Sequence, residues 1–338
     1  MDIYQLGEFG LIDEIKKKFP CREKSSLLGI GDDAAIINFN SKLTVVSSDM
    51  LIEGIHFDLS YFPLKHLGYK SVIVNLSDIY SMNANPSQIL LNIALSSKFR
   101  SDAIHEFYEG VKIACDEYNI DLVGGDTSSS VSGMTISCTA IGSVDKKNIT
   151  RRDGAKPNDI ICVSGDLGRS YIGLMILQRE KSNFIKNPKS QPELENYKDL
   201  IEKQLRPKAR NDIIKYLSEH NVIPNSMIDV SDGISSDLVH ISQSSNLGFK
   251  VFEDKLPISK EVKKISKELN IDYISSALNG GEEYEILFSL SPEDFNKIDK
   301  KVSDISPIGF FTNNKDKTIV CRDGREDELK SYGWKHFK

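Results

Sequence analysis

Carboxylates with hydroxyl side chains beside them recur along the chain. Asp49, Asp126 and Asp232 each follow a short apolar run, Asp78 ends the segment 74–78, and we expect each of these four where an element meets a turn. Oxygen ligands of this kind suit Mg²⁺, which bridges to the phosphates of a substrate. The pattern therefore favours a phosphate site with several magnesium ions. The side chains that make up the pattern are Asp32, Asp33, Ser47, Ser48, Asp49, Ser77, Asp78, Asp126, Thr127, Ser231 and Asp232.

A single aspartate of this kind is better explained as a turn or helix-capping residue, so only the whole set points to a site. Residues 29–34 read Gly-Ile-Gly-Asp-Asp-Ala, which fits a dinucleotide-binding pattern. Two carboxylates would then face a pyrophosphate, and like charges at about 4 Å cost ~4 kcal/mol at an effective dielectric of 20. Phosphate binding here therefore requires cations. Sequence patterns of a P-loop, a nucleophile elbow or an H-E-x-x-H zinc site are absent.

The composition excludes several other classes. The chain has 338 residues, which predicts about two domains at ~150 residues each. Subtracting 49 Asp+Glu from 43 Lys+Arg gives a net charge of −6, which argues against nucleic acid and anionic membranes as partners. No apolar run approaches the ~20 residues of a membrane span. The first eight residues lack a basic, apolar leader, and the five cysteines are widely scattered, so we expect a cytoplasmic protein with reduced thiols.

Hydrophobic periodicity indicates an α/β (α+β) chain in two parts. In the first half it predicts strands at 43–48, 89–95 and 134–141, and helices at 66–82 and 102–118. The polar segment 146–159 places a domain boundary there, which gives domains 1–147 and 148–338. The second half predicts a polar surface insertion at 181–199. The other elements expected there are a strand at 160–165, a helix from about 170, helices at 200–219 and 232–245, and a strand at 285–290.

Several longer blocks resemble the thiamine-monophosphate kinases. They occur in order from residue 7 to residue 337 and so cover nearly the whole chain. Any one of them alone would also fit the wider superfamily of aminoimidazole ribonucleotide synthetase, selenophosphate synthetase and hydrogenase maturation factors. The blocks are residues 7–12, 29–35, 48–57, 74–78, 124–127, 152–156, 228–233, 280–285 and 333–337.

The resemblance implies a fold, a reaction and a set of site residues. The first domain would have a mixed sheet that pairs across a homodimer into a barrel, and the second would be a layered α/β domain. ATP would donate its γ-phosphoryl group to thiamine monophosphate, in the biosynthesis of thiamine diphosphate. Several Mg²⁺ ions would be held by Asp33, Ser47, Ser48, Asp49, Asp78, Asp126, Asp232 and, more weakly, Asp237. Gly125, Arg152 and Ser231 would bind ATP, and His56, Glu282 or Glu283, and Trp334 would bind thiamine monophosphate.

This chemistry needs no covalent nucleophile. The acceptor phosphate is already an anion, so we expect direct in-line transfer assisted by metal ions. The thiazolium ring of thiamine is a cation, for which a Trp face and a Glu carboxylate are suitable neighbours. On sequence alone Trp334 is better explained as a core anchor, while His56 is as well explained as a backbone partner and Arg152 as a solvated boundary residue. Arg151 is the neighbour of Arg152, so either arginine could be the functional one.

Two blocks depart from the family pattern. Residues 280–284 read Gly-Gly-Glu-Glu-Tyr where the family has Gly-Gly-Glu-Asp-Tyr, and Asn83 replaces the usual glycine after Met82. Asn tolerates a left-handed turn, so the backbone geometry is expected to survive. The alternative functions are another ATP-dependent synthetase or maturation factor of the superfamily, or a non-catalytic nucleotide-binding homologue.

Overall fold

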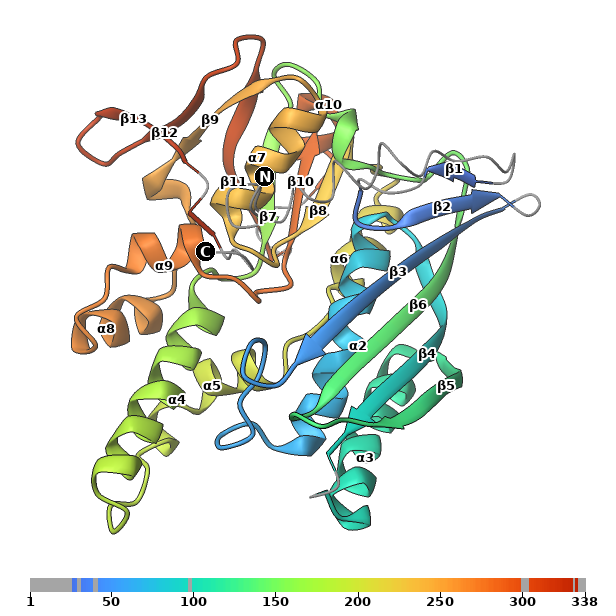
Figure 1. Ribbon diagram of the computed structural model, residues 1–338. Coiled ribbons are helices and arrows are strands. Elements are labelled where there is room, and N and C mark those ends of the chain that lie inside the picture. Colours follow the sequence, from blue (N-terminus) through green and yellow to red (C-terminus); the bar gives the residue numbers. More distant parts are fainter. Residues whose placement is uncertain are drawn as a thin grey trace, which may run out of the picture.

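The computed structural model describes residues 26–28, 32–38, 42–96, 99–298, 304–330 and 332–333. It has two sheets with helices packed between and around them, which confirms the α/β class (Figure 1). Strands and helices of the first half are β1 (Ser26–Leu28), β2 (Ala35–Asn38), β3 (Lys42–Ile52), α2 (Leu64–Ser81), β4 (Asn85–Leu95), α3 (Ser101–Tyr118), β5 (Asp121–Ser129) and β6 (Thr135–Asp145).

The second half contains the remaining strands and helices. They are η1 (Arg152–Gly154), β7 (Ile160–Ser164), α4 (Arg169–Lys186), η2 (Glu195–Tyr197), α5 (Lys198–Leu205), α6 (Asn211–Glu219), β8 (Ser226–Asp229), α7 (Ile234–Ser244), β9 (Gly248–Phe252), η3 (Glu253–Lys255), α8 (Lys260–Glu268), α9 (Tyr273–Asn279), β10 (Ile286–Leu290), α10 (Pro292–Phe295), β11 (Ile305–Thr312), β12 (Lys317–Val320) and β13 (Glu326–Glu328).

The first sheet has the order β1-β2-β3-β6-β4-β5. Its long central pair is antiparallel, with Lys42 opposite Asp145 at one end and Ile52 opposite Thr135 at the other. Strand β5 pairs with β4 in parallel, so the sheet is mixed as expected. Side chains alternate between buried and partly exposed along β6, because among the described residues helices cover one face of the sheet and not the other.

Helix α2 lies between this sheet and the second half of the molecule (Figure 1). It contacts β3, β4 and β6 on one side and β8 and α5 on the other. Almost every residue from Leu67 to Ser81 is therefore buried, including the polar residues Lys70, Asn75 and Ser77. A helix buried on all sides must provide partners for such groups, and α2 does so at the site described below.

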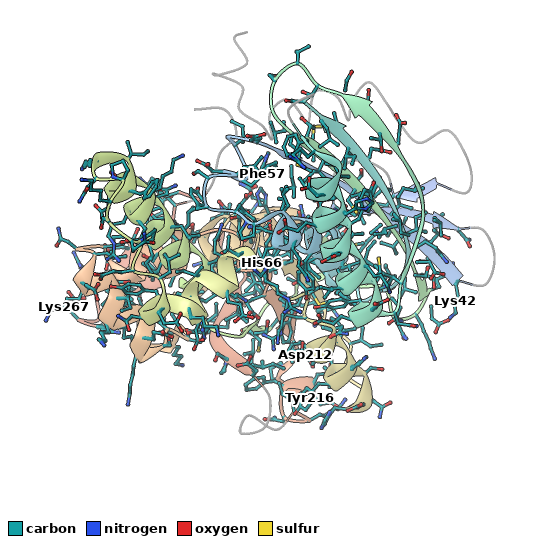
Figure 2. The ribbon with its side chains drawn as sticks, turned by 90° about the horizontal axis from the view of Figure 1, so that it is seen from below. Lys42, Phe57, His66, Asp212, Tyr216 and Lys267 are labelled. Carbon is teal, nitrogen blue, oxygen red and sulfur yellow. The ribbon has the colours of Figure 1, made fainter. Side chains whose placement is uncertain are left out.

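The second sheet has the order β13-β12-β9-β11-β7-β10-β8 and is largely antiparallel. Helix α7 packs beside β8 and β10, and α4 packs on α5, α8 and α9. Lys42 on β3 and Lys267 on α8 lie at opposite sides of the molecule when it is seen from below (Figure 2). The first sheet ends at Asp145 and the second begins at Ile160, and the predicted division after residue 147 falls between them.

Two predictions about elements are wrong in part. The helix predicted over 200–219 is two helices, α5 and α6, because Pro207 lies between them and cannot continue a helix. The predicted insertion at 181–199 includes the last turns of α4 and the start of α5. It also contains η2, and the residues that form an exposed connection outside these elements are 187–193.

The positions of three aspartates also differ from the prediction that each lies where an element meets a turn. Asp78 lies within α2, and Asp49 and Asp126 lie inside β3 and β5. The helix predicted over 66–82 agrees with α2 and already contains Asp78, so the expectation that Asp78 lies at the end of an element is wrong. Among the described residues, no helix combines the length and apolar character that crossing a membrane requires.

Helices α2 and α3 cross at two glycines that let their backbones touch. A Cβ atom on Gly68 would lie 1.9 Å from the carbonyl oxygen of Phe107, and one on Gly110 would lie 1.8 Å from that of Lys65. Neither carbonyl can move without displacing its helix. The contact therefore requires glycine at both positions.

We predict that Gly110→Ala lowers the free energy of unfolding by about 1–3 kcal/mol, the cost usual for overpacking. In an exposed helix, alanine is more favourable than glycine by roughly 1 kcal/mol. The destabilisation caused by the close contact must therefore exceed this gain in helix propensity. Urea denaturation measures the difference. Glu106→Ala, at an exposed position of α3, is the control and should leave the midpoint nearly unchanged. Equal midpoints for Gly110→Ala and wild type would contradict the close contact.

Candidate functional site

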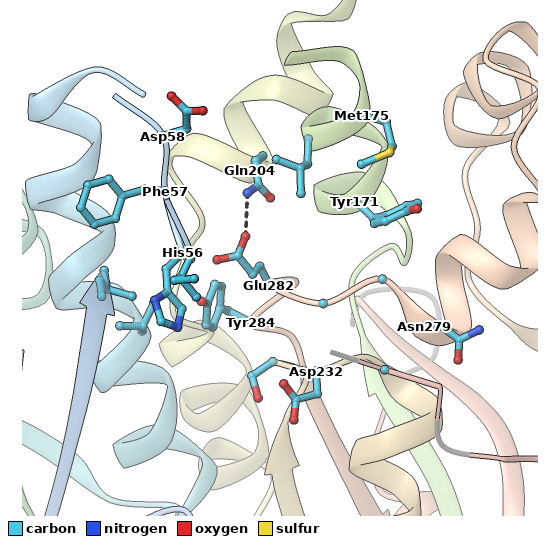
Figure 3. Close-up of a pocket in the computed structure, with 18 of the residues that line it drawn as sticks. His56, Phe57, Asp58, Tyr171, Met175, Gln204, Asp232, Asn279, Glu282 and Tyr284 are labelled. Atoms are coloured by element: carbon cyan, nitrogen blue, oxygen red, sulfur yellow. Dashed lines mark hydrogen bonds between the residues drawn. The ribbon is translucent and has the colours of Figure 1, made fainter. Parts of the chain in front are cut away.

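A cavity of about 1200 Å³ lies between the two halves of the molecule. Strand β3 and the loop after it form one wall, and α4, α9 and the 280–284 loop form the others (Figure 3). Four carboxylates, those of Asp49, Asp78, Asp229 and Asp232, line one part of it. Tyr171, Leu174, Met175 and other uncharged side chains line another part. The cavity can therefore take a molecule with a charged end and a ring system.

The carboxylates converge from elements that are far apart in sequence. Asp33, Asp78 and Asp229 each offer an oxygen, and these three oxygens lie within 4.8 Å of one another. Asp78 comes from the first half through α2, and Asp229 comes from the second half as the last residue of β8. This trio is a set of hard oxygen ligands with the spacing that a divalent cation needs.

Hydroxyl groups from α2 and β3 hold these carboxylates in place. Ser47 donates to Asp78, Ser77 donates to Asp229 at 2.6 Å, and Ser81 donates to Asp33 at 3.0 Å. The backbone N–H of Asp49 donates to the Asn75 side chain at 3.1 Å. Each of the three hydroxyl bonds fixes one carboxylate oxygen and leaves lone pairs of that carboxylate free for another ligand.

The electrostatics of this cluster are unfavourable without a cation. Burial, and then the negative charge of Asp229, raise the pKa of Asp49 to about 6. The pKa of Asp78 is raised well above its ordinary value by burial and by Asp49 and Asp229. Burial also raises the pKa of Asp229. Carboxylates that repel one another in a buried site fit a divalent cation, which would reverse the local sign of charge.

Arg152 lies against the same cluster. Its guanidinium contacts Asp33 and approaches Asp32 at 3.6 Å. Burial raises the pKa of Asp32 to about 6, although the charge of Arg152 acts in the opposite direction. Arg151 instead pairs with Asp153 at 2.9 Å with both side chains 44% exposed. The structure thus places Arg152 rather than Arg151 at the cluster.

Other predicted ligands are placed differently. Ser231 and Asp232 line the cavity, and so does Ser48, whose hydroxyl lies 2.8 Å from that of Thr139. Asp237 lies behind the cavity wall, where it accepts a hydrogen bond from the Gly233 N–H at 3.1 Å and burial raises its pKa well above normal.

Asp126 and Gly125 are not brought to the cluster within one chain. Both lie on β5, and Asp126 pairs through Asn92 and Ser137 with Met50, the neighbour of Asp49. Three strand spacings separate them, which is roughly 14 Å. A Cβ atom on Gly125 would lie 1.8 Å from the carbonyl oxygen of Leu91, so the backbone passes close to β4 there.

The structure places some of the candidate substrate-binding residues at the cavity and others away from it. His56 lines the cavity and accepts a hydrogen bond from the Ile52 N–H at its Nδ1 at 3.0 Å. Glu282 lines the cavity near Gln204 and above Asp232 in the view of Figure 3. Glu283 is fully buried, accepts a hydrogen bond from the Ser170 N–H, and has a pKa that burial raises to about 8. Trp334 lies outside the described residues.

Asp229 is the member of the trio that the sequence prediction missed. It stands three residues before Asp232, inside what reads as a buried strand. An acidic residue in an otherwise apolar strand was the available signal, because a buried charge needs a partner or a metal.

Comparison with known proteins adds to this geometry. Residues 31–144 match the family described as AIR synthase related protein, N-terminal domain. The chain is 36% identical over 338 residues to the thiamine-monophosphate kinase of Aquifex aeolicus (strain VF5), covering 100% of each. It is 32% identical over 339 residues to that of Bacillus subtilis (strain 168), covering 98% of this chain and 100% of the relative. The chain belongs to the thiamine-monophosphate kinase family.

A solved structure agrees with this family membership. The structure described as AaThiL complexed with AMPPCP and TMP is 34% identical and has a TM-score of 0.84. The match covers 100% of this chain and 99% of that one. The resemblance to thiamine-monophosphate kinases drawn from the sequence blocks is thereby confirmed.

For the carboxylate cluster we predict that Asp49→Asn raises the melting temperature of the metal-free protein at neutral pH. The folded-state pKa of Asp49 is raised above its ordinary value of 3.8 to about 6, so the folded protein binds the extra proton. The cost to stability is absent below about pH 3.8, grows as the pH rises, and is complete above about pH 6. The difference in melting temperature between variant and wild type should therefore grow between pH 4 and pH 7.

Mg²⁺ should offset the loss of stability that the ionised Asp49 causes in the wild type. It should raise the melting temperature of the wild type, as any ligand of the folded state does, and raise that of Asp49→Asn much less. Asp145→Asn, at the exposed end of β6, is the matched control and should respond to Mg²⁺ like the wild type. Identical Mg²⁺ responses in all three proteins would contradict a metal site at this cluster.

Proposed function

We propose that this protein transfers the γ-phosphoryl group of ATP to the phosphate of thiamine monophosphate, giving thiamine diphosphate and ADP. The observation that carries the proposal is the cavity, in which a buried carboxylate cluster adjoins a wall of uncharged and aromatic side chains. Thiamine monophosphate has a matching division into a phosphate and a cationic ring system. Similarity over the full length to thiamine-monophosphate kinases supports the same reaction.

Magnesium is the metal that the donor set fits. Asp33, Asp78 and Asp229 would hold it, with Asp49 and Asp232 at the same part of the cavity. A bound Mg²⁺ would neutralise the phosphate charges whose repulsion otherwise keeps the two substrates apart. All five donors are carboxylates, and the hydroxyl of Ser47 adds a further oxygen close by.

The chain's own residues orient the two substrates. Arg152 offers a guanidinium to the ATP phosphates, and Ser231 offers a hydroxyl from the cavity wall. His56 and Glu282 line the cavity where the thiamine moiety would lie, and the carboxylate of Glu282 suits a cationic ring. The acceptor phosphate attacks as an anion, so no residue is needed to remove a proton or to carry the phosphoryl group.

A homodimer would complete this site. Within the part of the chain that the structure describes, strand β5 is an open sheet edge on which all nine residues are exposed, including Leu122 at 41% and Val123 at 56%. Open apolar edges of this kind are normally covered. Asp126 and Gly125 lie on the same strand, too far from the cluster of their own chain, so pairing of two chains through this sheet offers them a cluster on the partner.

The alternative functions fit less well. A synthetase or maturation factor of the superfamily would share the fold, but the full-length relatives at 32–36% identity are thiamine-monophosphate kinases. A non-catalytic homologue would have no reason to keep three buried carboxylates together against their repulsion. The cytoplasmic location, and the division into domains 1–147 and 148–338, stay predictions from the sequence.

The assay of this proposal is product analysis with ATP, thiamine monophosphate and Mg²⁺. We expect thiamine diphosphate, with no label from [γ-³²P]ATP retained on the protein. Asp78→Asn and Asp229→Asn should each lower kcat by at least ~100-fold, because each removes a charge from the metal donor set. Asp145→Asn, on an exposed strand end, should keep wild-type turnover. A protein that forms no thiamine diphosphate, or an Asp229→Asn variant with full turnover, would overturn the proposal.

The dimer has its own test in the mass of the protein by size exclusion with light scattering. We expect two chains for the wild type and one for Val123→Glu, since a buried carboxylate would oppose pairing at β5. Ile223→Glu changes a side chain that is 43% exposed in the other half, and it should remain a dimer. A wild-type mass of one chain would contradict this interface.

A further inference from the structure

Lys70 is a lysine buried in the middle of α2, with an exposure of 1%. Its ammonium group lies 2.8 Å from the Glu282 carboxylate and donates to the backbone carbonyl of Gln204 at 3.1 Å. The same group lies 5.4 Å from the centre of the Phe62 ring. Lys70 is not among the residues that line the cavity, whereas Glu282 is. Lys70 therefore reaches the cavity through Glu282.

Glu282 is held in one position from several sides. Gln204 donates from its side-chain nitrogen to the second carboxylate oxygen of Glu282 at 2.6 Å (Figure 3). Ser170 at the start of α4 donates in turn to Gln204. The Glu282 backbone has a φ of 61°, a left-handed conformation that non-glycine residues seldom adopt. Such strain persists only where the surroundings impose it.

The same loop also contacts the segment that carries Asp232, at the part of the cavity lined by the four carboxylates. The Glu282 N–H donates to the carbonyl of Ser231 at 2.7 Å, next to Asp232. A Cβ atom on Gly281 would lie 2.5 Å from that carbonyl, so the loop lies directly on this segment. The position of the Glu282 carboxylate is thus set relative to the carboxylate cluster on one side and to α2 on the other.

We propose that Lys70 is a positioning residue for the substrate. Lys70 holds the Glu282 carboxylate in the cavity wall, at the place where this carboxylate contacts the cationic part of thiamine monophosphate. This inference rests on the proposed function. A buried ammonium is costly unless it is paired, and here the pair joins the first half of the chain to the second. Since each oxygen of Glu282 accepts one bond from Lys70 or Gln204, lone pairs remain for a ligand.

A second buried pair close by provides a matched control. Lys203, the neighbour of Gln204, lies 2.5 Å from Glu285, which also accepts hydrogen bonds from Ser164 and Arg210. Neither Lys203 nor Glu285 lines the cavity. This pair is also a lysine–glutamate ion pair and is largely buried, with side chains that are 15% and 4% exposed, so its loss should affect stability and not the binding of substrate.

The test is steady-state kinetics of the full chain with both substrates varied. Lys70→Met removes the charge at nearly constant volume, and Glu282 can still be hydrated because its side chain is 27% exposed. We expect the KM for thiamine monophosphate to rise about tenfold or more, comparable to the loss seen when the hydrogen-bonding partner of a metal-ligating side chain is removed. The KM for ATP should change less than twofold. Lys203→Met should lower the melting temperature and leave both KM values unchanged.

A double-mutant cycle separates positioning from a general structural effect. Glu282→Gln alone should raise the same KM, and adding Lys70→Met to it should change that KM less than twofold, because Lys70 acts through Glu282. Multiplying effects, an unchanged KM in Lys70→Met, or an equal rise in Lys203→Met would each overturn the proposal. If Lys70→Met does not fold, Lys70→Gln must show the same selective rise in KM, and an unchanged KM there overturns the proposal.

The outcome distinguishes this inference from the proposed function. If the wild-type protein converts thiamine monophosphate to thiamine diphosphate and Lys70→Met has wild-type KM values, the function stands and the role of Lys70 does not. If the wild type forms no thiamine diphosphate, the proposed function itself has failed, and with it the substrate assigned to Glu282.

Discussion

Mutual repulsion among the carboxylates of Asp49, Asp78 and Asp229 is the constraint on which the rest of the structure depends. All three lie where the two halves of the molecule meet, and burial raises their pKa values. Left to themselves, three such charges would push α2, β3 and β8 apart. Hydroxyl donors from Ser47 and Ser77 and the cation of Arg152 offset part of this repulsion. A divalent cation would offset the remainder, so stability and metal binding are linked at this point.

Helix α2 is the element that makes this arrangement possible. One of its faces carries Lys70, Ser77 and Ser81, at spacings of seven and four residues, and another carries Asn75 and Asp78. The first face reaches the 280–284 loop, the end of β8 and the segment before β2, while the second reaches β3. Its polar residues are thus partners for groups from several different elements. The helix is held close to the first sheet on one side and to α3 through glycine contacts, which leaves it little freedom to move.

The sequence predicts those parts of the fold that have one buried face. Strand β6 was expected from its alternation, and its buried Ile136, Cys138 and Ala140 follow that alternation. Helix α2 agrees with the helix predicted over 66–82, whereas the expectation that Asp78 ends an element fails, because residue type alone does not distinguish a buried ligand from a turn residue. The break at Pro207 lies in a run whose apolar spacing continues on both sides, so periodicity alone joined α5 to α6.

The candidate site was predictable by residue type more than by geometry. Asp49, Asp78 and Asp232 meet in one cavity as the set of aspartates suggested. Asp229 was overlooked because strand burial ordinarily excludes charge, and Lys70 because a lysine in a helix is ordinarily exposed. Asp126 shows the opposite limit: its residue type fits the site, yet the order of strands places it three strands away in its own chain. Neither a tertiary partner nor a strand order can be read from local pattern.

The most direct measurement of the central claim is Mn²⁺ binding, followed by electron paramagnetic resonance, to the protein with a non-hydrolysable ATP analogue. The account predicts Mn²⁺ bound to the complex in excess of what the free nucleotide carries, and loss of that excess in a folded Asp229→Asn variant. Mn²⁺ binding no greater than that of the nucleotide alone, or an excess that persists in Asp229→Asn, would contradict the view that these buried carboxylates are held together for a metal.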